Sequence, residues 1–142
     1  MPRQLEFSQE TADAICEKLV EGISLRRICM AEDMPAASTI FKWLNALPDF
    51  AEQYAHAREA QADTLADEII DIADDGTNDY MADKEEEDGV RYNGDAVQRS
   101  KLRVDARKWV AAKLRPKKYG DKREVEHKGG ISVTSLPLDE DL

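Results

Sequence analysis

Cationic side chains that could bind a polyanion are concentrated in one stretch of this sequence. Residues 96–123 contain eleven Lys and Arg and two Asp, a net charge of +9, although the whole chain has a formal net charge of −10. The preceding residues 63–95 contain thirteen Asp and Glu and two Lys and Arg, a net charge of −11. This separation indicates that the two blocks contact each other, within one chain or between subunits, or that one of them contacts a polyanion.

A second set of candidate polyanion contacts lies in the first fifty residues, on predicted short helices. Ser8 and Ser24 are good N-caps, Gly22 suits the end of the first helix, and residues 33–35 (Asp-Met-Pro) break the second. A third helix is predicted over residues 38–44. A short helix, a break and a further helix are typical of the helix-turn-helix motif, whose second helix enters the DNA major groove. The motif's geometry predicts five DNA contacts: Arg26, Arg27, Ser38, Thr39 and Lys42.

The same pattern also fits an ordinary three-helix bundle whose exposed face is polar. Residues 1–45 contain five Lys and Arg against seven Asp and Glu. That balance is a weak electrostatic footprint for a domain that binds DNA alone. If the motif binds DNA, many copies acting together would compensate for weak single contacts.

The sequence lacks the residue patterns that catalysis or metal binding requires. It has neither a phosphate-binding GxxxxGK[ST] motif nor a Ser/His/Asp-like set. The acidic residues 83–88 lack the spacing of a calcium-binding loop. Cys16 and Cys29, with two His, are too few for a zinc site and are interpreted as small buried hydrophobic residues. We therefore predict no catalytic residue, no metal and no cofactor.

Two long helices are predicted to position these residues. The first runs from about residue 49 to residue 75, a length of ~40 Å, and the second from Asp95 to about residue 114. The acidic residues 76–95 between them are predicted to form a long mobile loop, so the helices would form an antiparallel hairpin. The N-terminal bundle is too small to cover the apolar stripe of the first helix. Oligomerisation is therefore predicted through Leu65, Ile69, Ile72, Leu102 and Trp109.

The C-terminal residues are predicted to form a short β segment. Strand-like residues 125–127 and 131–134 flank two glycines, and a lone hairpin is marginal in water, so we expect it to join copies from neighbouring subunits. Residues 137–142 are interpreted as a disordered tail or as a docking peptide. The expected fold is mainly α, with a helix-turn-helix domain (1–47), central oligomerisation helices (48–115) and a C-terminal β segment and tail (116–142).

Several short motifs in this order carry a resemblance to a known family. The specific ones are residues 102–105 (Leu-Arg-Val-Asp), 107–109 (Arg-Lys-Trp), Pro116 and 118–122 (Lys-Tyr-Gly-Asp-Lys). From Ser8 to Lys122 the chain resembles the small terminase subunit of tailed double-stranded DNA bacteriophages, in the group typified by that of a Shigella podovirus. It departs from the family pattern at residues 76–95, where its acidic loop is longer.

The resemblance implies a homo-oligomeric ring of eight or more subunits around a central helical channel, with the C-terminal strands combined into a barrel. It implies that the ring binds the packaging site of double-stranded viral DNA and delivers DNA to the large terminase subunit. That large subunit holds the ATPase and nuclease, which the small subunit regulates without a catalytic site of its own. The expected location is the host cytoplasm, without a membrane partner, and not the mature virion.

Two other classes of function are compatible with parts of the sequence. A phage-encoded helix-turn-helix transcriptional regulator would use the same motif, and it would be a dimer rather than a ring. An enzyme would need a clustered acid/base or metal constellation, which the sequence does not provide. The subunit number distinguishes the first alternative from the ring.

Overall fold

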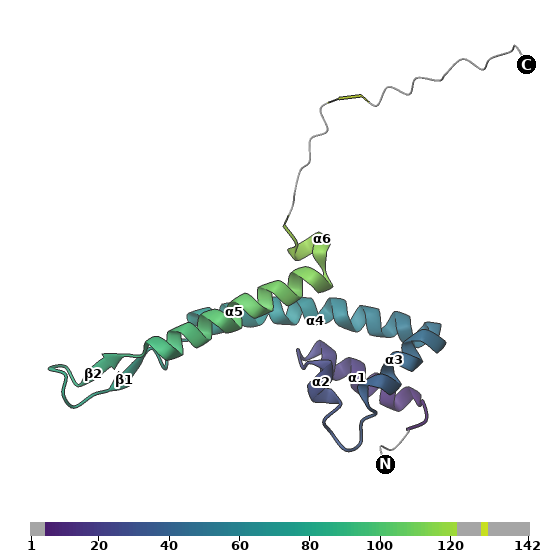
Figure 1. Cartoon of the computed structure of the whole chain (residues 1–142), viewed down its shortest axis with the longest axis horizontal. Helices are drawn as coiled ribbons and strands as arrows, with labels where there is room; N and C mark the ends of the chain where they lie inside the picture. Colours follow the sequence, from purple (N-terminus) through teal and green to yellow (C-terminus); the bar gives the residue numbers. More distant parts are fainter. Residues whose placement is uncertain (1–4, 122–128, 131–142) are drawn as a thin grey trace, which may run out of the picture.

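The computed structural model describes residues 5–121 and 129–130 of the chain, and this part is mainly helical (Figure 1). Its elements in chain order are α1 (Gln9–Val20), α2 (Leu25–Ile28), α3 (Ala37–Ala46), α4 (Pro48–Asp74), β1 (Tyr80–Ala82), β2 (Val90–Tyr92), α5 (Gly94–Leu114) and α6 (Pro116–Tyr119). The mainly α fold class is therefore confirmed. Of the predicted C-terminal β segment and tail (116–142), the first residues form α6 instead, and the strand-like residues 125–127 and 131–134 lie outside the described residues.

The predicted caps determine where the first two helices begin. The Ser8 hydroxyl accepts a hydrogen bond from the Thr11 amide, and the Ser24 hydroxyl accepts one from the Arg27 amide. Gly22, with φ of +92°, has a backbone conformation that residues with a Cβ rarely adopt, and it turns the chain between α1 and α2. The sequence therefore predicted both helix starts and the turn between them.

The core of the N-terminal helices extends into α4. Ile15, Leu19 and Ile40 are fully buried, and Phe50 and Ala57 of α4 belong to the same cluster. Two hydrogen bonds add to this packing, from Gln61 Nε2 to the Ile23 carbonyl (3.0 Å) and from Thr64 Oγ1 to the Val20 carbonyl (2.6 Å). The predicted division at residue 47 stays a prediction, but the core is continuous across it.

The two long helices form the predicted antiparallel hairpin, with α5 running back along α4 (Figure 1). Leu65 and Ile72 of α4 are buried, as is Ala111 of α5. An ion pair between Arg107 Nε and Glu68 Oε2, 2.7 Å apart, joins the helices along the same contact. The first half of α4 therefore packs on the N-terminal bundle and the second half on α5.

The prediction of a long mobile loop at residues 76–95 was wrong in part, because this stretch contains a β-hairpin. β1 and β2 pair antiparallel with Tyr80 opposite Tyr92, and the two rings meet edge to face with centroids 6.2 Å apart. Gly89, with φ of +75°, ends the turn. The second long helix, predicted to begin at Asp95, begins at Gly94, and the side chain of Asn93 accepts a hydrogen bond from the Ala96 amide.

Candidate nucleic-acid interface and assembly surfaces

The five predicted DNA contacts lie on α2 and α3, as the helix-turn-helix pattern requires. Arg26 and Arg27 are exposed on α2, Ser38 and Lys42 are exposed on α3, and Thr39 is half-buried. Ile40 and Trp43 anchor α3 from the opposite side, since both are buried in the core. The packing of Ile40 and Trp43 therefore fixes α3 and holds Ser38 and Lys42 at the protein surface.

Two features of this region were not predicted. The connection between α2 and α3 spans residues 29–36, which is longer than the three- or four-residue turn of the usual motif. Phe41 is exposed beside Lys42 on α3. Helical spacing places Phe41 on a different side of α3 from Ile40 and Trp43. This spacing is the one sequence signal that could have indicated its exposure.

The five predicted oligomerisation residues separate into two groups. Leu65 and Ile72 are each 8% exposed, because α5 and the rest of the chain already cover them, and Ile69 is half-buried. Leu102 and Trp109 are 61% and 64% exposed. The single chain therefore covers the α4 stripe and leaves large apolar side chains of α5 at the surface.

Among the residues of α5, Ala111 is the one that is buried, so the large apolar side chains of this helix do not define its side toward α4. Its side toward α4 includes Ala111, which is buried, and Arg107, whose partner Glu68 lies on α4. Trp109 borders a groove of about 510 Å³ between the two helices, which is also lined by Ile69, Ala112 and Tyr119. An exposed tryptophan beside an apolar groove is typical of an interface residue.

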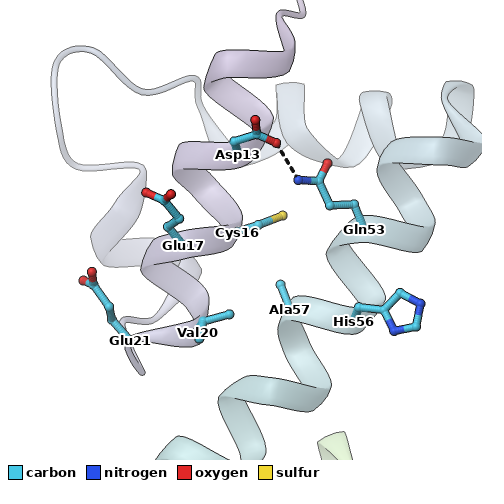
Figure 2. A pocket seen from close by; sticks show the side chains of 8 residues that line it. All are labelled: Asp13, Cys16, Glu17, Val20, Glu21, Gln53, His56 and Ala57. Atoms are coloured by element: carbon cyan, nitrogen blue, oxygen red, sulfur yellow. Dashed lines mark hydrogen bonds between the residues drawn. The ribbon is translucent and has the colours of Figure 1, made fainter.

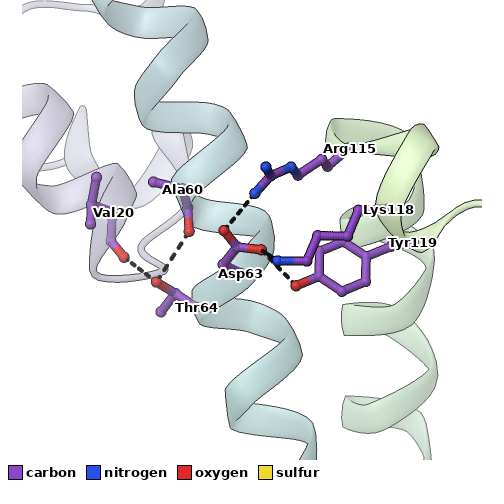
Figure 3. Close-up of polar contacts among 7 residues, drawn as sticks. All are labelled: Val20, Ala60, Asp63, Thr64, Arg115, Lys118 and Tyr119. Atoms are coloured by element: carbon purple, nitrogen blue, oxygen red, sulfur yellow. Dashed lines mark hydrogen bonds and ion pairs between the residues drawn. The ribbon is translucent and has the colours of Figure 1, made fainter.

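Asp63 on α4 binds three side chains of the basic segment that follows α5 (Figure 3). Its carboxylate accepts from Arg115 Nη1 at 2.7 Å, from Lys118 Nζ at 3.0 Å and from the Tyr119 hydroxyl at 2.6 Å. Part of the basic block therefore contacts the acidic block within one chain. The sequence did not identify Asp63, because 52 to 56 residues separate it from its partners.

These contacts shift the ionisation of the groups involved. The hydrogen bond from Tyr119, and after it that from Lys118, lowers the pKa of the Asp63 carboxyl below its ordinary 3.8. The hydrogen bond to Asp63 raises the pKa of Lys118 above 10.5 and the pKa of Tyr119 above 10.0. We call Asp63, Arg115, Lys118 and Tyr119 the α6 latch, because they hold α6 against α4.

A groove of about 650 Å³ lies between α1 and α4 (Figure 2). Cys16, Val20 and Ala57 line it, with Asp13 and Glu17 at its edge. Burial, and in addition the charge of Asp13, raises the pKa of the Cys16 thiol. A protonated thiol is a poor nucleophile, so this groove has no activated cysteine.

Two further classes of site have no candidate in the part of the chain that the structure describes. No cluster of three or more His, Cys, Asp or Glu side chains within residues 5–121 and 129–130 is placed to hold a metal ion. No helix over the same residues is long and apolar enough to cross a membrane.

Comparison with known proteins identifies the family. The family described as "Bacteriophage Sf6, terminase small subunit-like" matches residues 7–126. Crystal structures of three single-substitution variants of the terminase small subunit gp1 of the bacterial virus Sf6 are similar at 37%, 37% and 38% identity, with TM-scores of 0.65, 0.65 and 0.66. Each match covers 94% of this chain and 95% of that chain. No curated protein matches. On this evidence, the chain belongs to the Sf6-type family of terminase small subunits.

Proposed function

We propose that this protein is the DNA-recognition subunit of a phage packaging machine. In this role it forms a ring, binds the packaging site of viral DNA through α2 and α3, and regulates the ATPase and nuclease of the large subunit. Exposed cationic and hydroxyl groups on a helix-turn-helix, within a chain of this family, are the observation that carries the proposal. The role is non-catalytic and belongs to the host cytoplasm during assembly.

The division of labour between the two cationic regions supports this role. Arg26 and Arg27 lie on the short helix that crosses the backbone in a helix-turn-helix, where they would bind phosphates. Ser38 and Lys42 lie in the first half of α3, which would enter the major groove. Arg107, Arg115 and Lys118, in contrast, already pair with carboxylates of α4. The basic block therefore contributes to structure first, and the DNA interface is assigned to α2 and α3.

Ring formation would allow DNA contacts that are weak in a single chain to give tight binding together. The family resemblance implies a ring of eight or more chains, and each chain would present one α2–α3 surface. Several such surfaces acting on one DNA molecule multiply their effect through the effective concentration that the ring imposes. The exposed Leu102 and Trp109 would lie at contacts between neighbouring chains.

A binding titration with phage DNA tests the DNA interface. The variants are Arg26→Glu, Arg27→Glu and Lys42→Glu, with Lys117→Glu as the matched control, because that exposed lysine lies on α6, in the basic block that the proposal does not assign to DNA. Each interface change is expected to weaken binding and to reduce the salt dependence by about one counterion per lost phosphate contact. If all four variants bound alike, the assignment to α2 and α3 would be wrong.

The C-terminal residues from about 125 are proposed to bind the large subunit. A chain truncated after Lys122 is expected to assemble and bind DNA as the full chain does, but to lose stimulation of the large-subunit ATPase. Full stimulation by the truncated chain would contradict this part of the proposal. The DNA-binding part would be unaffected by that result.

A further inference from the structure

The β-hairpin at the far end of the long helices has an apolar face that none of the described helices covers. The pairing register places Tyr80 and Tyr92 opposite each other and Ala82 opposite Val90, so these four side chains share one face. Tyr80 and Tyr92 are 65% and 59% exposed. An isolated two-stranded sheet is marginal in water, and a face with two exposed tyrosines has the composition of an interface. This hairpin therefore needs a partner surface.

The charge of the hairpin indicates the chemistry of that partner. Residues 79–92, which we call the acidic hairpin, contain six Asp and Glu and two Lys and Arg, a net charge of −4. Within the described residues, Asp83 is the one of these six carboxylates that forms an ion pair, with Arg91 at 3.8 Å. The partner surface should therefore combine apolar and cationic groups.

The outward side of α5 has this combination. Leu102 is exposed there, and Lys101 and Lys108 are exposed beside it at a spacing of two helical turns. Asp105 is exposed between them, and Asp105 and Lys108 also border the groove beside Trp109. The surface is continuous with Trp109, which the proposed function places at a subunit contact.

The acidic hairpin cannot reach this surface of its own chain. It joins the start of α5 through Asn93 and points away from both long helices (Figure 1). Leu102 lies eight residues into α5, about 12 Å from its start. The strands are three residues long, so each spans about 10 Å. A neighbouring chain that is displaced along the helix axis by about this length would place its Leu102 within reach of the hairpin. A tilt of the neighbouring chain could have the same effect.

We propose that the acidic hairpin of one subunit docks on the outward side of α5 of a neighbouring copy. Tyr80, Val90 and Tyr92 cover Leu102, and the carboxylates of the turn approach Lys101 and Lys108. This inference rests on the proposed assembly and adds a named contact to it. The competing arrangement, in which the hairpins of neighbours pair edge to edge, would bring two surfaces of charge −4 together, and like charges in contact are unfavourable.

A charge-swap experiment on the full chain tests the contact. The variants are Glu85→Lys/Glu86→Lys in the turn, Lys101→Glu/Lys108→Glu on α5, and the combination of all four changes. Association is measured as the concentration at which the assembly dissociates, by sedimentation at two salt concentrations. Each pair alone is expected to raise that concentration by roughly three- to tenfold at low salt, and the combination to restore most of the loss.

The control variant makes an equal change in net charge at a site outside the proposed contact. Glu32→Lys/Asp33→Lys alters two exposed carboxylates between α2 and α3 and should leave association unchanged. Stronger association of Glu85→Lys/Glu86→Lys would overturn the inference in favour of hairpin-to-hairpin pairing, and unchanged association of every variant would overturn it in favour of a solvated hairpin. In both cases the wild-type assembly would still stand. A wild-type chain that does not assemble would instead remove the proposed function on which this contact rests.

Discussion

At the scale of single residues, Asp63 explains why the segment after α5 has its particular composition. One carboxylate accepts from a guanidinium, an ammonium and a phenol that lie within five residues of one another in sequence. Gly120 follows this group because a Cβ there would lie 2.5 Å from the Pro116 carbonyl oxygen. The basic motif of residues 115–120 therefore has a structural role, which is one of the alternatives that the charge separation left open.

The α6 latch predicts an order of effects at Asp63. Asp63→Asn keeps one acceptor but removes the negative charge that two cations share, so the hydrogen-bonded amides of residues 118–120 should exchange several-fold faster with deuterium. Tyr119→Phe removes one hydrogen bond and leaves both ion pairs, so its effect should be smaller. Asp67→Asn, an exposed position on the same helix, is the control. Equal exchange in Asp63→Asn and Asp67→Asn would contradict the latch.

Adjacent residues of α3 provide a second test at this scale. Ile40 is fully buried and Phe41 is exposed, so Ile40→Ala should cost about 3 kcal/mol of unfolding free energy and Phe41→Ala less than about 0.5 kcal/mol. Urea unfolding at one protein concentration measures both. A similar loss from the two variants would show that α3 is rotated relative to this structure.

At the scale of elements, the prediction of helices succeeded where short-range signals decide. Ser8 and Ser24 cap the helices that they were predicted to cap. The long helices follow from apolar spacing, and Pro48 begins α4. These signals come from residues that are close together in the chain, so the sequence alone is enough to predict them.

The features that the sequence did not predict depend on residues far apart in the chain. The orientation of α5 depends on Arg107 and Glu68, which are 39 residues apart. The acidic hairpin has strands of three residues, too short to show alternation, and its acidic turn resembled a solvated linker. The candidate DNA contacts stay a prediction from a local motif, whereas Asp63 and the exposed side of α5 became visible in the folded chain.

The α6 latch also predicts a pH dependence of this element. The folded-state pKa of Asp63 is lowered, so its contribution is present above 3.8 and is lost as the pH falls through the lowered value. The pKa values of Lys118 and Tyr119 are raised, so their contributions are present below about 10 and are lost as the pH rises through the raised values.

Hydrogen-exchange protection of α6, corrected for intrinsic exchange, measures this dependence. It should be constant between about pH 5 and about pH 9 and should decrease at both extremes. In Asp63→Asn the acid decrease should disappear, because no carboxyl remains to titrate. An unchanged acid decrease in that variant would assign it to another group.

At the scale of the whole molecule, the two halves of α4 pack against different parts of the chain. The first half of α4 completes the core of the N-terminal helices, and the second half packs on α5. The hydrogen bonds of Gln61 and Thr64 lie where these two halves meet, so they set the orientation of the helix-turn-helix on the long helices. A ring built from α4 and α5 would thus hold each DNA-binding surface at a defined angle.

The division between covered and exposed apolar residues predicts two separable defects. Leu102→Ser/Trp109→Ser should raise the concentration at which the assembly dissociates, with little loss of helix content, since both side chains are exposed in the single chain. Leu65→Ala should instead lower the unfolding free energy by about 3 kcal/mol, because Leu65 is already buried. Sedimentation and circular dichroism distinguish the two outcomes, and an assembly unaffected by the double change would exclude this side of α5 from the contact.

The central claim is that this chain acts on DNA as a ring, and a native mass spectrum of the full chain, with and without packaging-site DNA, tests it most directly. We predict a closed assembly of eight or more chains that gains the mass of DNA when DNA is added. The same experiment on Arg26→Glu should give the assembly with less DNA bound. A dimer that binds DNA would contradict the account and would identify a transcriptional regulator instead.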